Sequence, residues 1–450
     1  MPWRAACGVS SRSLACAPDG GCMSRVARGL LCLAAGGLLL SCSSSTEWIG
    51  PLPAECQEFA QAESGPATHV EEDGLPVFNL FISESLPDEE GYFVARLVYR
   101  GRCQRLWVRL RGNTSHFFPK RSYTLEFPKD APFDEPLLGG GFTGRRKVVL
   151  ISPFNDNSYM RHRLAFTLWN RMSPGHIPVK TYSAVVYVNG SYVGLYTVAD
   201  HLDKHLMAAQ GLDGEGELFK ASGDDANFSH LDVKGRPKRD LKQGFEKRAG
   251  HPESGSDAYD SIRAFTAFVI DSSPERFRVE RHAWMTYEYE DWWIFSTLIV
   301  ANDSVSKNAY HYREPELGSR WRYIPWDLDA SFGQNWDTRR NDPREHPLYT
   351  TRNHLFARML EDPSIAASLR ERYRVLLQGE LRAERVLGLI DEYAREVAVA
   401  ARRDEVRWRE DYLSFFRWKS RTDFTTFDEE VEYLRWWVQM RWGALEQQLP

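Results

Sequence analysis

The sequence predicts an α+β protein built as two lobes, a sheet-rich lobe over residues 75–256 and a helical lobe over residues 257–450. In the first part, short runs rich in β-branched and aromatic residues follow one another closely, and several alternate apolar with polar residues, as half-buried strands do. In the second part, apolar residues recur at helical spacing. Strands first and helices afterwards is an order typical of α+β folds.

The composition is that of an ordinary globular protein. The chain has 450 residues, 42% hydrophobic and 26% charged, so it is long enough for two or three lobes with their own cores. Its 15 Trp, 19 Tyr and 24 Phe are more often large core side chains than a carbohydrate- or peptide-binding face. A formal net charge of −5 gives no basic footprint, so no nucleic acid is expected as a partner.

Residues 1–41 are predicted to be a signal peptide, with Met23 as the true start. The apolar run Leu30–Leu40 is too short to span a bilayer and suits the core of such a peptide. It leads to Cys42 in a sequence that resembles the bacterial lipobox, where the cysteine is lipidated and becomes the first residue. Residues 42–74 would then be a lipidated cysteine and a polar tether. We expect a membrane-anchored lipoprotein of the bacterial cell envelope, facing the periplasm or the exterior; a plain secretory signal is the alternative.

The cysteines suggest one disulfide bond. Of the seven cysteines, only Cys42, Cys56 and Cys103 remain after the expected processing. If Cys42 carries lipid, Cys56 and Cys103 form an even pair in an oxidising compartment, where a disulfide is the natural expectation. Two unpaired buried thiols are the alternative.

Strand-like runs and a polar hairpin tip open the predicted sheet-rich lobe. Runs of strand composition cover 77–82, 92–99 and 105–110. A polar turn then leads into the alternating run 119–127, which completes a hairpin. The backbone amides at its tip could cover phosphate groups, although Gly-Asn turns are common and the signal alone is weak. The tip residues of interest are Arg111, Asn113 and Ser115.

Further elements follow in order. A strand begins at Lys147, and Asn155–Ser158 should cap a helix over 159–172 in which Arg161 lies outside the apolar stripe. The clearest hairpin covers 183–198 and has Asn-Gly at its tip, a type I′ signal. Helical patterns later in the chain cover 259–270, 284–300, 355–360, 363–379, 381–406 and 429–449.

Two polar stretches lie between the hairpin and the helices. His201 and His205 are one helical turn apart, but they lack the rest of a metalloprotease motif, so solvated surface histidines are favoured over a zinc site. A short strand over 217–221 contains Lys220. The long polar loop 222–256 is basic in places, and such a loop is more often a lid or binding loop than core.

The segment 301–333 has the residue types that phosphoryl transfer requires. Asp303 and Asn308 are five positions apart, which is the spacing of the protein-kinase loop H-R-D-x-x-x-x-N, with Asn302 in place of the Arg. A predicted hairpin then leads to Asp327 and Asp329, placed on one face of a strand, where two like charges need a counter-ion. A metal is the favoured counter-ion and a structural ion pair the alternative. Asp303 alone could be an ordinary turn former.

The chain resembles the CotH family of bacterial spore-coat and surface proteins, which are atypical protein kinases. The resemblance rests on a series of matching pieces that occur in the family's order. They are Arg111–Ser115, Pro119–Phe127, Asn155–Ala165, Tyr187–Tyr196, Leu218–Lys220, Asn302-Asp303 with Asn308, and Trp326–Gly333; Phe427–Arg441 resembles the family's closing helix.

The resemblance implies a two-lobed atypical protein-kinase-like fold and a role for each matching residue. Asp303 would be the catalytic acid, and the metal ligands would be Asn308, Asp327 and Asp329. Lys120 is preferred over Lys147 as the lysine that meets the α/β-phosphates. The other nucleotide-binding candidates are Arg111, Asn113, Ser115, Arg161 and Lys220. Where family members often have Glu, this chain has Asp200, which puts the strength of catalysis in doubt.

The function that follows is an envelope-anchored, CotH-like Ser/Thr protein kinase. It would transfer the γ-phosphoryl group of ATP, with Mg²⁺ or Mn²⁺, to an exported or surface protein. Two alternatives remain open: a catalytically weak or inactive surface adhesion or structural protein on the same fold, and a metal-dependent phosphoester hydrolase.

Overall fold

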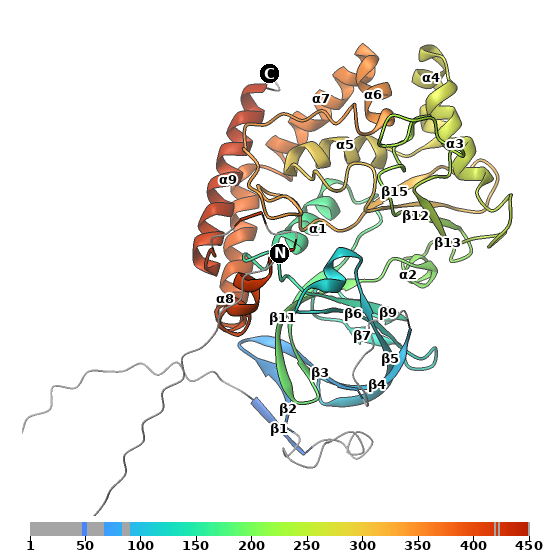
Figure 1. Ribbon diagram of the computed structural model, residues 1–450. Helices are drawn as coiled ribbons and strands as arrows, with labels where there is room; N and C mark the ends of the chain where they lie inside the picture. Colours follow the sequence, from blue (N-terminus) through green and yellow to red (C-terminus); the bar gives the residue numbers. More distant parts are fainter. Residues whose placement is uncertain (1–46, 52–66, 83–90, 418–419, 422–423, 449–450) are drawn as a thin grey trace, which may run out of the picture. The chain divides into compact units, whose positions relative to one another are not determined.

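The computed structural model describes residues 47–51, 67–82, 91–417, 420–421 and 424–448, and confirms the mixed α+β class (Figure 1). The predicted signal peptide, Cys42 and Cys56 lie outside the described residues. Residues 44–450 group as one compact unit. The kinase-like arrangement in two lobes stays a prediction.

A large sheet in the first half of the chain closes on itself. Its strand order is β1-β2-β3-β10-β11-β9-β6-β5-β4, and because β3 also pairs with β4, the strands from β3 to β4 form a barrel. Closure leaves no unpaired edge within that ring. The strands are β1 (Glu47–Pro51), β2 (Ala67–Glu72), β3 (Leu75–Ile82), β4 (Phe93–Tyr99), β5 (Arg102–Arg111), β6 (Ser122–Glu126), β9 (Lys147–Ile151), β10 (Thr181–Val188) and β11 (Ser191–Asp200).

The barrel interior follows from the alternation in the strands. On β5, Leu106 and Val108 are fully buried, while Arg105 before them and Trp107 between them are not. Successive side chains of a strand point to opposite faces, so the apolar residues of each strand fill the inside. The interior cluster includes Phe78, Leu80, Leu97, Leu106, Val108, Leu125, Leu150, Tyr182, Val186 and Val198.

A second, smaller sheet includes two strands from the segment 301–333. Its order is β13-β12-β14-β15, all antiparallel. The strands are β12 (Glu217–Ala221), β13 (Phe245–Ala249), β14 (Ala309–Arg313) and β15 (Arg322–Pro325). This sheet combines residues from both sides of the lobe boundary predicted at residue 256. Two further strands, β7 (Phe133–Glu135) and β8 (Phe142–Arg145), pair with each other, and a 3₁₀ turn, η2 (Thr114–Phe117), follows β5.

The helices come mainly after residue 256. They are α1 (Arg161–Met172), α2 (Lys204–Ala209), α3 (Asp260–Asp271), α4 (Pro274–Trp284), α5 (Glu288–Ile299), α6 (His354–Glu361), α7 (Pro363–Gln378), α8 (Ala383–Ser414) and α9 (Phe427–Gln448). α8 and α9 run side by side in Figure 1, and α8 also contacts β11. The sequence prediction missed α4, and it extended the next helix back to residue 284, although that helix, α5, begins at Glu288.

Helix α5 is the centre of the main core. Every one of its residues is buried, which is unusual for a helix with three acidic residues in its first turn. Trp292 lies 4.3 Å from Tyr323 in a stacked pair, and Trp293 is 2% exposed. Many of the aromatic residues thus fill the core, the use that the composition favoured.

A buried ion-pair network ties α1 to α9. The Arg161 guanidinium is fully buried, 2.5 Å from the Asp156 carboxylate and 2.6 Å from the Glu430 carboxylate. Arg340 also binds Glu430, at 2.5 Å. Burial alone would raise the pKa of Glu430, but the two arginines hold it far below its usual range. The carboxylate is therefore ionised inside the fold and depends on its partners.

Glu430→Gln is expected to lower the free energy of unfolding by about 3–5 kcal/mol, because the Asp156 carboxylate alone then faces Arg161 and Arg340, which leaves one positive charge of the network uncompensated. The depressed pKa means that Glu430 stabilises the fold above its unfolded pKa of about 4.3 and loses this contribution as the pH falls. Urea titrations at pH 7 and pH 4 measure both effects, and the difference between wild type and variant should shrink at pH 4. Glu432→Gln, at an exposed position on the same helix, is the matched control. An equal effect of both substitutions would contradict the network's role.

Cys103 on β5 forms a disulfide bond. Cys56, its predicted partner, lies outside the described residues, so the pairing itself stays a prediction. Cys103→Ser should lower the free energy of unfolding by about 2–4 kcal/mol, because the cross-link restricts the unfolded chain. Unfolding curves with and without reductant check this, since reductant should destabilise the wild type and leave the variant unchanged. Mass mapping without reduction should find the Cys56 and Cys103 peptides linked.

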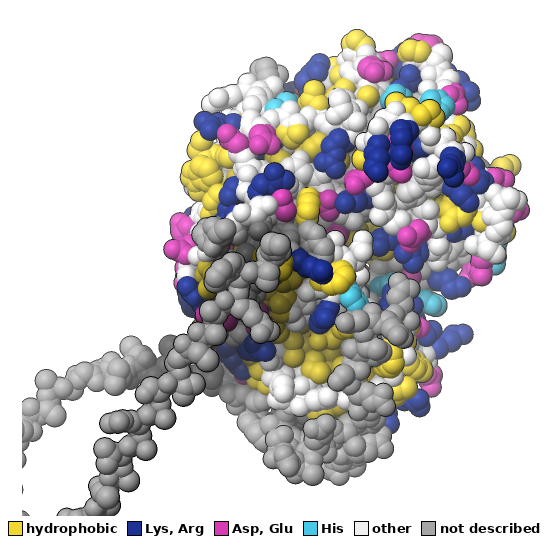
Figure 2. Space-filling view, in the orientation of Figure 1, with side chains coloured by type: hydrophobic (Ala, Val, Ile, Leu, Met, Phe, Trp, Pro, Cys, Tyr) yellow, Lys and Arg dark blue, Asp and Glu magenta, His cyan; other side chains and the backbone are white. Residues whose placement is uncertain are grey.

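The surface carries charges of both signs. Figure 2 shows Lys and Arg side chains interspersed with Asp and Glu on the face turned to the viewer, in keeping with the modest net charge. Within the described part of the chain, no helix is both long enough and apolar enough to cross a membrane.

Candidate functional site

The loop after α5 is held in place by the core beneath it. α5 ends at Ile299, and its C-cap residue, Val300, adopts the left-handed conformation with φ 53°. Trp292 on α5 donates its indole N–H to the Ser304 carbonyl at 3.1 Å, and the Asn353 amide donates to the Val305 carbonyl at 2.6 Å. Because buried side chains fix its backbone on both sides, this polar loop presents its functional groups from a rigid base.

Asp303 and Asn308 meet across this loop. The Asn308 amide nitrogen donates to the Asp303 carboxylate at 2.9 Å and to its carbonyl at 3.0 Å. Lys307 places its ammonium 3.0 Å from the other carboxylate oxygen. Burial raises the pKa of Asp303, although Lys307 opposes that shift. Asp303 is thus a half-buried, oriented carboxylate with a raised proton affinity, as a general base requires.

The β14–β15 hairpin brings Asp327 back to Asn308. Asn308 directly precedes β14, and Trp326, just after β15, donates its backbone N–H to the Asn308 carbonyl at 2.9 Å. Asn308 and Asp327 both have φ 57°. Left-handed backbone is uncommon for residues other than glycine, and it often occurs at functional sites. The hairpin thus fixes an acid and an amide side by side.

Asp327, Asp329 and His162 form a cluster whose ligand atoms all lie within 4.8 Å of one another. His162 comes from α1, and its Nε2 accepts a hydrogen bond from the Leu328 backbone N–H at 3.3 Å. The Asn155 amide donates to the Asp329 carboxylate at 2.8 Å. The prediction that the two acids lie on one face of a strand was wrong. β15 ends at Pro325, and the left-handed backbone at Asp327 brings the two acids together after the strand.

The electrostatics of this cluster favour a bound cation. Burial raises the pKa of Asp329 to about 7, and the nearby charges of Asp327 and Asp303 add to this effect. Burial also lowers the pKa of His162 to about 4, so its imidazole is neutral, the form that binds metals. A divalent cation would relieve the repulsion between the carboxylates.

The residues present fit a divalent metal. Asp327 and Asp329 offer oxygen ligands, which Mg²⁺ and Mn²⁺ both accept, and the amide oxygen of Asn308 is a further candidate from the sequence. The imidazole of His162, which the sequence did not indicate, suits Mn²⁺ better than Mg²⁺.

Two predicted nucleotide-binding cations lie near the acidic cluster. Arg111, at the end of β5, has its guanidinium 5.5 Å from the Trp326 ring centre, over the ring face. Burial lowers the pKa of Arg111 and of Lys220 on β12, and Asp327 counteracts the shift in both. Cations beside the predicted metal ligands are what a phosphate-bearing substrate requires.

Other nucleotide-binding candidates lie elsewhere. Lys120 is buried, with its ammonium 2.5 Å from the Asp404 carboxylate on α8 and 2.6 Å from the Leu195 carbonyl. Its position at the phosphates stays a prediction, and these contacts already account for its charge. Arg161 has a structural role in the buried network described above, because its side chain is fully buried and used by two carboxylates.

The remaining candidates are peripheral or paired. Lys147 lies 3.2 Å from Glu126 in a half-buried ion pair on the neighbouring strand. Asn113 is exposed beside η2, next to half-buried Ser115. Asp200, which stands where the family often has Glu, is buried and binds Arg145 at 2.7 Å. The structure therefore uses Asp200 inside the fold.

Sequence reasoning missed four residues around the site: His162, Asn155, Lys307 and Asp224. Asp224 follows β12 and accepts a hydrogen bond from the Ser306 hydroxyl at 3.1 Å. Lys307 lies 3.6 Å from Asp224, so it bridges that acid and Asp303. Lys307 had a local signal, since it lies one helical turn after Asp303 in sequence. Asp224 had no such signal, because its contacts with Ser306 and Lys307 join segments that are far apart in sequence.

Comparison with known proteins identifies the family of this chain. A family model described as "CotH kinase protein" matches residues 108–445, which include every element of the site. No curated protein matches the chain. The match covers most of the chain, so this protein belongs to the CotH kinase family.

Proposed function

We propose that this protein is a metal-dependent protein kinase that transfers the γ-phosphoryl group of ATP to a Ser or Thr hydroxyl of an exported or surface protein. The observation that carries the proposal is the meeting of Asp303 and Asn308 with the Asp327–Asp329 cluster at the two ends of one hairpin. Family membership supports a kinase. The acceptor class and the location come from the sequence alone.

In this proposal each side chain has a distinct task. Asp327 and Asp329, with Asn308 or His162, would hold Mg²⁺ or Mn²⁺, which neutralises phosphate charge when bound. Arg111 and Lys220 would pair with the phosphates. Asp303 orients the acceptor hydroxyl and takes its proton as the new O–P bond forms and the bond between the γ-phosphorus and the bridging oxygen breaks, so that ADP leaves.

The decisive experiment incubates the purified chain with ATP labelled at the γ position, Mg²⁺ or Mn²⁺, and an envelope extract. Label on a protein, retained as phosphoserine or phosphothreonine, supports the proposal. Metal-dependent release of free phosphate without an acceptor indicates a phosphoester hydrolase, the function that a cluster of two carboxylates and an imidazole favours second. A wild-type chain that binds no nucleotide with either metal leaves the adhesion or structural role.

Anchoring to the envelope is part of the proposal and rests on Cys42, which lies outside the described residues. Cys42→Ala should release the protein from membrane fractions and prevent lipid labelling, because one residue carries the whole anchor. Fractionation of cells that express wild type and variant measures this. An unchanged membrane fraction would refute the lipobox interpretation.

A further inference from the structure

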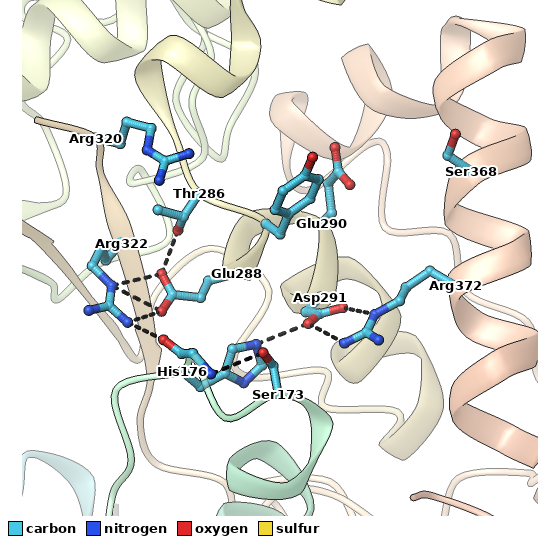
Figure 3. A pocket seen from close by; sticks show the side chains of 12 residues that line it. Ser173, His176, Thr286, Glu288, Glu290, Asp291, Arg320, Arg322, Ser368 and Arg372 are labelled. Carbon is cyan, nitrogen blue, oxygen red and sulfur yellow. Dashed lines mark hydrogen bonds and ion pairs between the residues drawn. The ribbon is translucent and has the colours of Figure 1, made fainter. Parts of the chain in front are cut away.

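A second hollow, of about 670 Å³, lies at the opposite end of α5 from the catalytic loop (Figure 3). α5 has 12 residues, so at 1.5 Å per residue it is about 18 Å long, and the hollow lies against its first turn. None of the metal-binding or catalytic candidates lines it. The lining residues that matter come from the turn after α1, the start of α5, the start of β15 with the residues just before it, and the helix α7; they are His176, Glu288, Asp291, Arg320, Arg322 and Arg372.

The buried acids of this hollow are already neutralised. Arg322 binds the Glu288 carboxylate through two nitrogens, at 3.1 and 2.6 Å. Arg372 binds Asp291 through two nitrogens, both at 3.1 Å, and His176 lies 3.0 Å from the same carboxylate. These contacts hold α1, α5, α7 and β15 together. Glu290, the third acid of the lining, lies 3.0 Å from Arg281 and 3.2 Å from His282, so each acid that lines the hollow has a basic partner.

The hollow also presents guanidinium groups that its acids do not use. Arg320 is exposed, lines the hollow and has no ion-pair partner in the described part of the chain. Arg322 and Arg372 each use Nε and Nη2 for their carboxylates, and their Nη1 atoms have no acceptor among the described residues. Figure 3 shows Arg320 and Arg322 on one side of the hollow and Arg372, from α7, on the other.

We propose that this hollow is a binding site for an anionic group, a carboxylate or a phosphate. Guanidinium groups bind such planar or tetrahedral anions through paired N–H donors, and Arg is preferred over Lys for this purpose. The volume is in the range of small-molecule sites and holds more than a single ion. Internal packing explains the Glu288 and Asp291 pairs, but it explains neither the hollow nor Arg320.

The anion has two possible sources, an acidic residue of a protein segment or a free small anion. The test therefore uses two probes on the purified chain without ATP or metal: inorganic phosphate, and a fluorescent tetraglutamate peptide that contains no hydroxyl residue. Binding of the peptide is followed by fluorescence anisotropy, and phosphate by calorimetry and by competition. Peptide binding that phosphate does not displace identifies a protein segment as the source, whereas phosphate that binds and displaces the peptide identifies a free anion.

Arg320→Gln should weaken binding of whichever probe binds the wild type about tenfold, the effect of one charge-assisted contact. Arg320 is exposed, so the fold should tolerate its loss. Arg370→Gln removes the same charge at an exposed position of α7 outside the hollow and should keep wild-type affinity. An equal loss in both variants, or no binding of either probe to wild type, would overturn the proposal.

The nucleotide site must be separated from this one. Lys220→Gln, combined with the same titrations, should leave anion binding unchanged, because the hollow shares no residue with the proposed phosphate site. Loss of anion binding in that variant would place the probe at the nucleotide site and overturn the proposal. Since no step of this test uses ATP, a failure of the kinase proposal would not affect it.

Discussion

Asp327→Asn is expected to abolish metal-dependent ATP binding and phosphoryl transfer together. Asp327 is the exposed member of the cluster with Asp329 and His162, so it is the member most accessible to incoming substrate. An amide removes the negative charge that holds a divalent cation, and without the cation the phosphates lose their counter-ion. Calorimetric titration of ATP with Mg²⁺ and with Mn²⁺ measures the loss directly.

The choice of Asn over Ala keeps this test free of backbone strain. Asp327 has φ 57°, a conformation that Asn adopts readily and Ala adopts at a cost of about 1–2 kcal/mol. Asp327→Asn should therefore melt within a few degrees of wild type, while Asp327→Ala should melt lower. Wild-type ATP affinity in a folded Asp327→Asn chain would contradict the metal assignment. A drop in affinity only in the variant that melts early would show that Asp327 acts through folding.

The local parts of the fold could be predicted from sequence, and the closure of the barrel could not. Alternation on β5 and the Asn-Gly turn at residues 189–190 predict a strand and a hairpin, because neighbours in sequence determine both. The parallel pairing of β10 with β3 and the pairing that closes β3 on β4 join separate elements. No residue pattern within either strand specifies those partners.

The same distinction applies to the site. Asp303 and Asn308 are five residues apart in one loop, and the sequence grouped them in one candidate site; their hydrogen bond is a finding of the structure. Asp327 and Asp329 were expected to be close because of a strand, yet the left-handed backbone at Asp327 brings them together after the strand has ended. The expectation of two neighbouring acids was useful, although its structural reason was wrong.

Lys120 and Arg161 illustrate why individual cations are hard to assign from sequence. Lys120 binds Asp404, which is 284 residues away, and Arg161 binds Glu430, which is 269 residues away. A basic residue in a family motif can neutralise a core acid as readily as a phosphate, and only the fold decides between them. His162 is the converse case, because an ordinary helical position places it at the metal cluster.

Asp303→Asn should slow phosphoryl transfer by about 10²–10⁴-fold while leaving ATP affinity nearly intact. In wild type, Asn308 and Lys307 orient the carboxylate, and burial raises its pKa, so it can accept the hydroxyl proton as the acceptor oxygen attacks. The amide has the same shape but cannot accept that proton. Single-turnover transfer from labelled ATP measures the rate, and calorimetry measures the affinity.

Asp342→Asn, an exposed acid outside the site, is the matched control and should transfer at the wild-type rate. Melting curves separate catalysis from folding, since Asp303 is only half-buried and its replacement by Asn should change the melting temperature little. A parallel loss of ATP affinity and rate in Asp303→Asn would instead make Asp303 a ligand of the metal–nucleotide complex. The Asp327 and Asp303 substitutions should therefore differ in their effect on ATP affinity, because Asp327 is proposed to hold the cation that ATP binding requires and Asp303 is not.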